Sequence, residues 1–206
     1  MVLRSRLGAV MKRDAHAAYG RYFIRSLYFD NARDKALMEK INGVNIREKF
    51  RIRYYNFDTS VIKLEKKSKV NGLCLKESAP LTKEMAQAIV DGNYGWMIKS
   101  PEPLIRELYS KMKSQGLRPR TIVDYEREPF VYAAGNVRVT LDYNIRTGLK
   151  CTDFLNPACV TVPASDTVIL EVKWDEFLPD IIRDIVQLPF SRTGNYSKYA
   201  VCRQYD

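Results

Sequence analysis

The sequence has very little histidine, and its cysteines do not form a metal-binding motif. His16 is the only histidine, which argues against histidine-based catalytic triads and histidine-ligated metals. The cysteines contain no Cys-x-x-Cys pair, so we expect no zinc site. Free thiols in a reducing cytosol are the simplest expectation for Cys74, Cys151, Cys159 and Cys202. Carboxylates, lysine, arginine and tyrosine remain as the groups that can carry chemistry.

Long hydrophobic runs are also missing. No apolar stretch approaches the roughly 20 residues that a membrane-spanning helix needs. The first 18 residues carry charges throughout, unlike a secretory signal peptide. We therefore expect a cytoplasmic protein without a membrane segment. Hydrophobic residues make up 46% of the chain, which is enough to form a core. The length of 206 residues predicts a single domain over residues 1–206.

Negative charge is in short supply. The chain has 34 lysines and arginines against 24 aspartates and glutamates, which gives a formal net charge of +10. Such a balance implies an anionic partner. Nucleic acid, a membrane surface and a phosphorylated small molecule are the three classes that remain open on charge alone.

Hydrophobic periodicity predicts a mixture of helices and antiparallel strands. The predicted helices are Val2–Ala18, Ala32–Ile41, Thr82–Val90 with Thr82 as N-cap, Pro101–Gln115 closed by Gly116, and Phe177–Val186 with Pro179 in its first turn. The predicted strands are Tyr22–Phe29, Arg47–Tyr55, Val61–Lys69, Leu73–Glu77, Thr121–Arg127, Val131–Ala133, Val137–Tyr143 and Thr167–Trp174. Residues 191–205 are polar and aromatic, and no internal repeat is present. The predicted class is therefore α+β.

Charged residues alternate with apolar ones along these strands. Because successive side chains of a strand point to opposite faces, the charges of each strand share one face. These same-face sets are Lys49, Arg51 and Arg53; Lys63, Glu65, Lys67 and Lys69; Arg138, Thr140 and Asp142; and Glu171 with Lys173. Such strands can close into an antiparallel barrel with a charged lumen, flanked by helices. The same pattern also suits a barrel with an apolar interior and its charges outside.

Several short motifs in this order are similar to those of one family. They are Ser-Leu-Tyr-Phe-Asp at residues 26–30, Arg51-Ile-Arg53, Leu-Glu-Lys-Lys at 64–67, Asp-Tyr-Glu-Arg at 124–127, Val-Arg-Val-Thr-Leu-Asp at 137–142, Leu-Glu-Val-Lys at 170–173 and Ser-Lys-Tyr at 197–199. From about Tyr19 to Cys202 the chain resembles the VTC domain. This domain is the polyphosphate polymerase branch of the triphosphate tunnel metalloenzymes, the CYTH superfamily.

The resemblance implies a tunnel-shaped barrel and a metal-dependent phosphotransferase that moves the terminal phosphate of ATP to a polyphosphate chain. It implies phosphate binding by Arg51, Arg53, Lys67, Lys76, Arg127, Arg138, Lys173 and Lys198. Of these, Arg51, Arg53, Lys67, Arg127 and Arg138 are expected to take part in catalysis together with Glu171. Manganese, or magnesium in its place, is expected at Glu171 with help from Glu65.

The chain departs from the family pattern at its start. Family members open with a charged strand, whereas this sequence begins directly on the predicted helix at Val2. We therefore expect a barrel that lacks one wall, either as a fragment or as a natural variant of reduced activity.

Other functions and placements stay open. A triphosphate hydrolase and a polyphosphate- or nucleotide-binding module without turnover are possible on the same fold, whereas no DNA or RNA is expected as a partner. Lys63 and Lys69 are expected to be solvated. Ser26 and Tyr28 are as compatible with the lumen as with the core.

Overall fold

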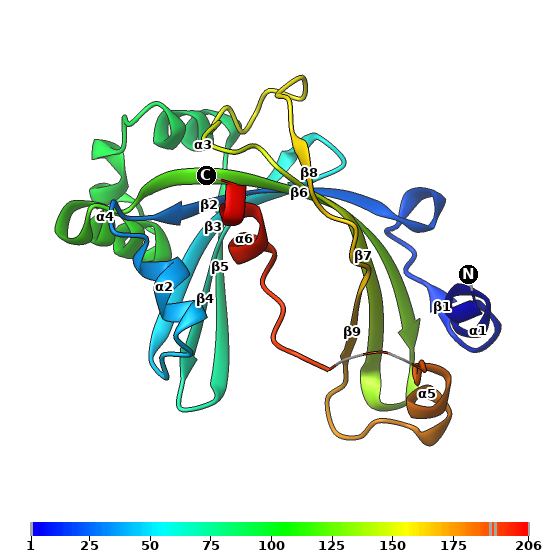
Figure 1. The fold of residues 1–206 in the computed structure, drawn as a ribbon. Coiled ribbons are helices and arrows are strands. Elements are labelled where there is room, and N and C mark those ends of the chain that lie inside the picture. The colour runs from blue at the N-terminus through cyan, green and yellow to red at the C-terminus, as the bar shows by residue number, and fades with distance from the viewer. Residues whose placement is uncertain (1, 190, 192, 206) are drawn as a thin grey trace. The chain divides into compact units, whose positions relative to one another are not determined.

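The computed structural model describes residues 2–189, 191 and 193–205. It shows an α+β fold in which helices flank a large antiparallel sheet, as the sequence predicted (Figure 1). The strands are β1 (Lys12–Arg13), β2 (Tyr22–Asp30), β3 (Arg47–Tyr55), β4 (Asp58–Val70), β5 (Leu73–Leu81), β6 (Arg118–Tyr132), β7 (Val137–Thr147), β8 (Val162–Ser165) and β9 (Ile169–Lys173). The helices are α1 (Val2–Val10), α2 (Lys35–Ile41), α3 (Lys83–Val90), α4 (Pro103–Gln115), α5 (Asp180–Ile185) and α6 (Lys198–Cys202).

The sheet follows the order β5-β4-β3-β2-β6-β7-β8, with β1 paired to β6 and β9 paired to β7. Within the described residues no hydrogen-bonded pairing joins β5 to the other end of this path. The closed barrel that the sequence predicted is therefore not seen in the hydrogen bonding.

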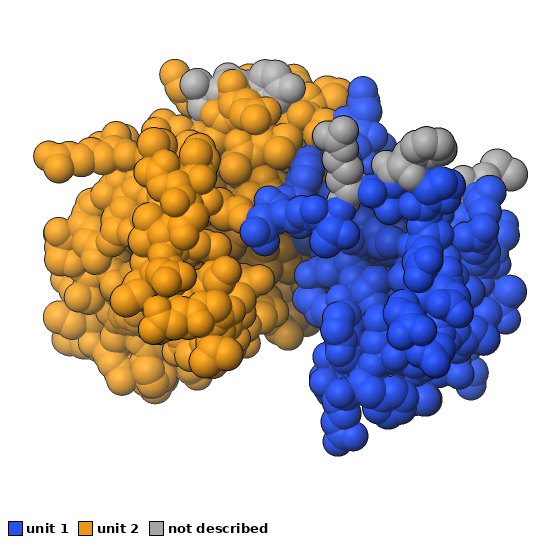
Figure 2. All heavy atoms as spheres, turned by 60° about the horizontal axis from the view of Figure 1, so that its bottom comes forward, with its two compact units in different colours: residues 1–22, 125–144, 166–196 blue, residues 23–124, 145–165, 197–206 orange. Residues whose placement is uncertain are grey.

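Two compact units divide the chain (Figure 2). The first unit consists of Met1–Tyr22, Tyr125–Asn144 and Asp166–Tyr196. The second unit consists of Phe23–Asp124, Ile145–Ser165 and Ser197–Asp206. The chain passes between them several times, and the single domain over residues 1–206 stays a prediction.

Two tight turns fix the register of β3, β4 and β5 in the second unit. Asn56 and Phe57 join β3 to β4 with φ values of 50° and 57°. Asn71 and Gly72 join β4 to β5 with φ values of 48° and 89°. Positive φ at both central residues is typical of the type I′ turn, whose twist matches that of the flanking strands. The turns thus determine which side chains lie opposite each other across the three strands.

Helices cover one face of these strands. Phe50, Ile52 and Leu64 are at most 1% exposed and pack in one core with residues of α3, α4 and the 3-10 turn Gly95–Lys99. The Thr82 hydroxyl caps α3 by accepting from the Met85 amide at 3.2 Å, and Gly116 ends α4 with a φ of 69°. Both helix boundaries confirm the sequence prediction. For the second unit, the apolar side chains therefore form the covered face and the charged ones the opposite face.

Other elements differ from the prediction. The first helix ends at Val10 instead of Ala18, because Arg13 pairs in β1 with Phe130 of β6 and lies over its ring at 4.1 Å. β6 is one long strand where two had been expected, since it continues through Pro129. β8 and α6 were not predicted. α5 begins at Asp180, with Pro179 as its N-cap.

Candidate functional site

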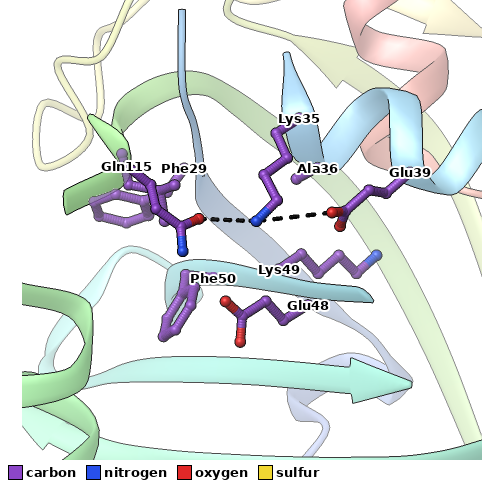
Figure 3. Close-up of a pocket in the computed structure, with 9 residues that line it drawn as sticks. Phe29, Lys35, Ala36, Glu39, Glu48, Lys49, Phe50 and Gln115 are labelled. Atoms are coloured by element: carbon purple, nitrogen blue, oxygen red, sulfur yellow. Dashed lines mark hydrogen bonds and ion pairs between the residues drawn. The ribbon is translucent and has the colours of Figure 1, made fainter. Parts of the chain in front are cut away.

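The uncovered face of β3, β4 and β5 carries most of the predicted phosphate ligands. Cα register places Arg51 opposite Glu65, and it places Lys67 between Lys49 and Lys76. Directly opposed residues of a sheet project from the same face. In the close-up of β3, Lys49 lies on one side of the strand, whereas Glu48 and Phe50 lie on the other (Figure 3).

Glu65 is bound by three cations of this face. Its carboxylate lies 2.7 Å from Arg51 Nη2, 3.6 Å from Arg53 Nη1 and 2.5 Å from Lys76 Nζ. Glu65 is 4% exposed and Arg53 is 5% exposed. Burial alone would raise the pKa of Glu65, but Arg51, Arg53 and Lys76 together lower the pKa to about 2. Glu65 is therefore ionised and holds these three side chains in place.

Tyr28 lies in a region with an excess of positive charge. Its buried hydroxyl accepts a hydrogen bond from Arg51 Nη1 at 2.9 Å, and its ring stacks on Tyr199 of α6 at 5.0 Å between centroids. Burial would raise the pKa of the phenol, but Arg51, Lys49 and Arg53 lower the pKa to about 7. The positive potential at Tyr28 is thus strong enough to favour an anion there.

The pKa of Lys49 is affected by the same excess of positive charge. Burial lowers its pKa first, and the nearby cations Arg51, Lys67 and Lys40 lower it further, to about 8. A small open hollow lies beside it, lined by Lys49, Arg51, Glu65, Lys66, Lys67 and Lys76. An added anion would relieve the repulsion among these side chains.

The covered face of the same strands is balanced instead. Lys66 Nζ lies 2.6 Å from Glu107, 3.3 Å from Glu77 and 3.7 Å from Glu48. The chain therefore supplies several carboxylates to one lysine on one face. On the other face, Glu65 is the carboxylate that contacts the cations.

The first unit contains a second charged group. Arg127 forms a two-pronged ion pair with Asp142, with two contacts of 2.7 Å. Asp142 raises the pKa of Arg127 above its ordinary value, although burial acts against this. Glu171 lies 3.8 Å from Arg127 and 3.4 Å from Lys173. The exposed fraction of the Glu171 side chain is 40%, so this carboxylate can still reach a ligand.

The structure thus gathers Arg51, Arg53, Lys67 and Lys76 in the second unit and Arg127, Glu171 and Lys173 in the first. Arg138, also in the first unit, pairs with Asp14 at 3.0 Å. Lys198 is half-buried at the first residue of α6. Convergence of all these side chains on one ligand stays a prediction.

Sequence reasoning left two members out of the site. Lys49 could have been predicted as a member of the site, because it lies two residues before Arg51 on the same face of the strand. Tyr28 had only the ambiguous pattern of its strand, and its place depends on Tyr199 from the far end of the chain.

The two predicted metal ligands differ in their surroundings. A cation at Glu65 would be repelled by Arg51, Arg53 and Lys76, so this carboxylate does not suit a metal. Glu171 also has cations nearby, Arg127 at 3.8 Å and Lys173 at 3.4 Å, but its side chain is 40% exposed and neither contact is as short as those of Glu65 with Arg51 and Lys76. Magnesium-type ions are often held by one or two carboxylates together with substrate phosphates. In the described part of the chain no three histidine, cysteine or acidic side chains group as a metal site. Glu171 therefore fits a metal that phosphate oxygens help to hold.

Comparisons with known proteins give the family. Residues 1–205 match the VTC domain, whereas the comparison with curated proteins found no match. A putative adenylate cyclase from Bacillus halodurans is 11% identical, with 93% of this chain and 88% of that chain covered and a TM-score of 0.49. A protein from Pyrococcus horikoshii OT3 is 12% identical, with 89% and 78% covered and a TM-score of 0.41.

Both TM-scores are below 0.5, so these likenesses do not establish a common fold. None of the helices that the structure describes is long and apolar enough to cross a bilayer. The match to the VTC domain extends over residues 1–205 and thus includes every motif singled out in the sequence. The chain belongs to the VTC domain family.

Proposed function

We propose that this chain binds linear polyphosphate and transfers the terminal phosphate of ATP to a polyphosphate chain in a metal-dependent reaction. The observation that carries this function is the uncovered face of β3, β4 and β5, where cations outnumber the carboxylate Glu65 that contacts them. Membership of the VTC domain family supports the same function.

Phosphoryl transfer suits the groups that this face offers. The reaction depends on positioning and charge neutralisation more than on a protein nucleophile. Arg51 and Arg53 supply positive charge that can neutralise phosphate oxygens, and Glu65 fixes the orientation of both guanidinium groups before a ligand arrives. Lys67 and Lys76 add charge from the neighbouring strands. Histidine and cysteine are not needed for any of these roles.

The first unit would contribute the metal-binding carboxylate. Glu171 would hold manganese or magnesium, which when bound supplies positive charge against the phosphate oxygens. Arg127 is held by Asp142, and its side chain, which is 16% exposed, adds positive charge beside Glu171. Arg138 remains a proposed phosphate ligand of the first unit beside Arg127.

Incubation with ATP and manganese, followed by gel analysis, tests this function. Long polyphosphate chains are expected as the product. Release of orthophosphate without chains would instead indicate a triphosphate hydrolase on the same site. Absence of any turnover would leave a binding module and would contradict the proposed transfer.

Two variants separate metal binding from phosphate binding. Glu171→Gln is expected to abolish manganese-dependent turnover, while metal-free binding of tripolyphosphate stays equal or becomes tighter because one negative charge is removed. Arg53→Ala is expected to weaken binding with or without metal, since it removes a buried cation of the site. If Glu171→Gln weakens metal-free binding as much as Arg53→Ala does, Glu171 is a structural ion-pair partner.

A further inference from the structure

Cations continue along β3 and β4 beyond the hollow that contains Glu65. Arg47 lies opposite Lys69, and Lys69 lies opposite Cys74 of β5. Both cations belong to the same face as Lys49, Arg51 and Arg53, because they occupy alternate positions of the strands. From Arg53 to Arg47 the strand rises by roughly 20 Å at about 3.3 Å per residue. The cationic row is therefore longer than three linked phosphates.

Like charges face each other along this row. The directly opposed pairs Arg47 with Lys69 and Lys49 with Lys67 are both cationic. Like charges in directly opposed positions destabilise a sheet. In the described part of the chain none of these four side chains forms an ion pair with a carboxylate. The covered face gives Lys66 three carboxylate partners, so the lack of partners here is a property of this face.

Lys40 belongs to α2, which packs against β3. Burial lowers the pKa of its ammonium, and Arg47, Lys69 and Lys67 lower it further through their charges. Lys40 also contributes to the lowered pKa of Lys49. Lys40 therefore lies within the electrostatic reach of both the far end of the row and the hollow. From the sequence, Lys40 had no predicted role and Lys69 was expected to be solvated.

We propose that Lys40, Arg47 and Lys69 form an extension subsite that binds the phosphates of a polyphosphate chain beyond the three held near Glu65. This subsite rests on the proposed function, and it assigns long chains as the preferred ligand over tripolyphosphate. A linear chain with one negative charge per phosphate matches a linear row of cations in shape and in sign. Binding would relieve the repulsion among the opposed pairs.

Single-stranded nucleic acid fits this row less well. Proteins that bind single strands combine cations with exposed aromatic rings on which bases stack. The aromatic side chains next to Arg51, Tyr28 and Tyr199, are 3% and 2% exposed and stack on each other. They are therefore not free to stack on a base.

Binding of two ligands to the whole chain tests the extension subsite. Titration calorimetry would compare tripolyphosphate with a polyphosphate of several tens of phosphates, for wild type and for the Lys40→Ala/Lys69→Ala double variant. The double variant is expected to lose about tenfold in affinity for the long chain and to keep its affinity for tripolyphosphate within about twofold. The dependence of long-chain affinity on salt should also become shallower, because fewer counterions are released.

A charge-matched control is available on the covered side of the sheet. Lys83→Ala/Lys99→Ala removes two exposed lysines of α3 and the 3-10 turn, and it is expected to leave both affinities unchanged. Equal losses for both ligands, no loss for the long chain, or the same loss in the control would each overturn the subsite. Tighter binding of a single-stranded oligonucleotide than of the long chain would assign the row to nucleic acid. Failure of wild type to bind tripolyphosphate would instead contradict the proposed function.

Discussion

Replacing Arg25 with alanine is expected to lower the free energy of unfolding by about 3–5 kcal/mol, the cost of leaving a buried charge without its partner. Arg25 Nε and Nη2 lie 2.9 and 2.8 Å from the carboxylate oxygens of Asp124. The two residues are 2% and 1% exposed. Burial raises the pKa of Asp124, and loss of Arg25 would raise it further. Urea denaturation followed by circular dichroism measures the change.

Two matched variants check this interpretation. Arg25→Met/Asp124→Leu removes both charges and is expected to recover much of the lost stability, because no unpaired charge remains. Arg21→Ala breaks an ion pair with Glu126 whose arginine side chain is 59% exposed, and it is expected to change stability little. A small effect of Arg25→Ala, or a double variant that is less stable than the single one, would show that the pair does not hold the core.

The affinity for tripolyphosphate is expected to rise as the pH falls from about 9 to about 6, and Tyr28→Phe is expected to flatten this dependence. The pKa of Tyr28 is lowered to about 7 in the free protein by Arg51, Lys49 and Arg53, against the effect of burial. A bound anion neutralises these cations and raises the pKa again, so binding takes up a proton. Below about pH 7 the phenol is already neutral and this linkage ends.

The variant should therefore bind about tenfold more tightly than wild type near pH 9, where wild-type Tyr28 would be a competing anion. The two proteins should bind alike near pH 6. Because tripolyphosphate also titrates, calorimetry on both proteins with the same ligand isolates the effect of Tyr28. Parallel pH profiles for the two proteins would mean that Tyr28 keeps its proton throughout.

The lowered pKa of Tyr28 also predicts how the stability of the ligand-free protein changes with pH. The pKa of Tyr28 is depressed on folding, so its contribution to stability is complete above the ordinary tyrosine pKa of about 10 and is lost as the pH falls through about 7. Lys49, with a pKa lowered to about 8, acts in the same direction. Thermal denaturation of wild type beside Tyr28→Phe measures this difference.

Strand alternation was enough to predict which charges of the second unit share a face. Lys49, Arg51 and Arg53 were placed together because the period of a strand is two residues, and turns at Asn56 and Asn71 then fix their register. The alternating pattern did not show whether the charged face or the apolar face is covered by helices. In the structure, α3 and α4 cover the apolar side.

Long-range contacts account for what the sequence did not predict. β1 has only Lys12 and Arg13, and its pairing with Val131 and Phe130 gives no signal within a local window. The place of Tyr28 depends on α6, where the Tyr199 hydroxyl donates to Asp30 across 169 positions of the chain. The ion-pair partner of Arg51 was also not predictable from the sequence. Arg51 was expected to bind phosphate, and in the structure it pairs with Glu65.

Titration of tripolyphosphate into the wild-type chain and into Arg51→Ala tests most directly whether the uncovered face of β3, β4 and β5 is the anion site. Arg51 contacts Glu65 at 2.7 Å and Tyr28 at 2.9 Å, at the centre of that face. Loss of its charge-assisted hydrogen bonds should weaken binding roughly 10- to 100-fold. Saturable wild-type binding with this loss is the predicted result. No binding by wild type, or equal affinity for both proteins, would contradict it.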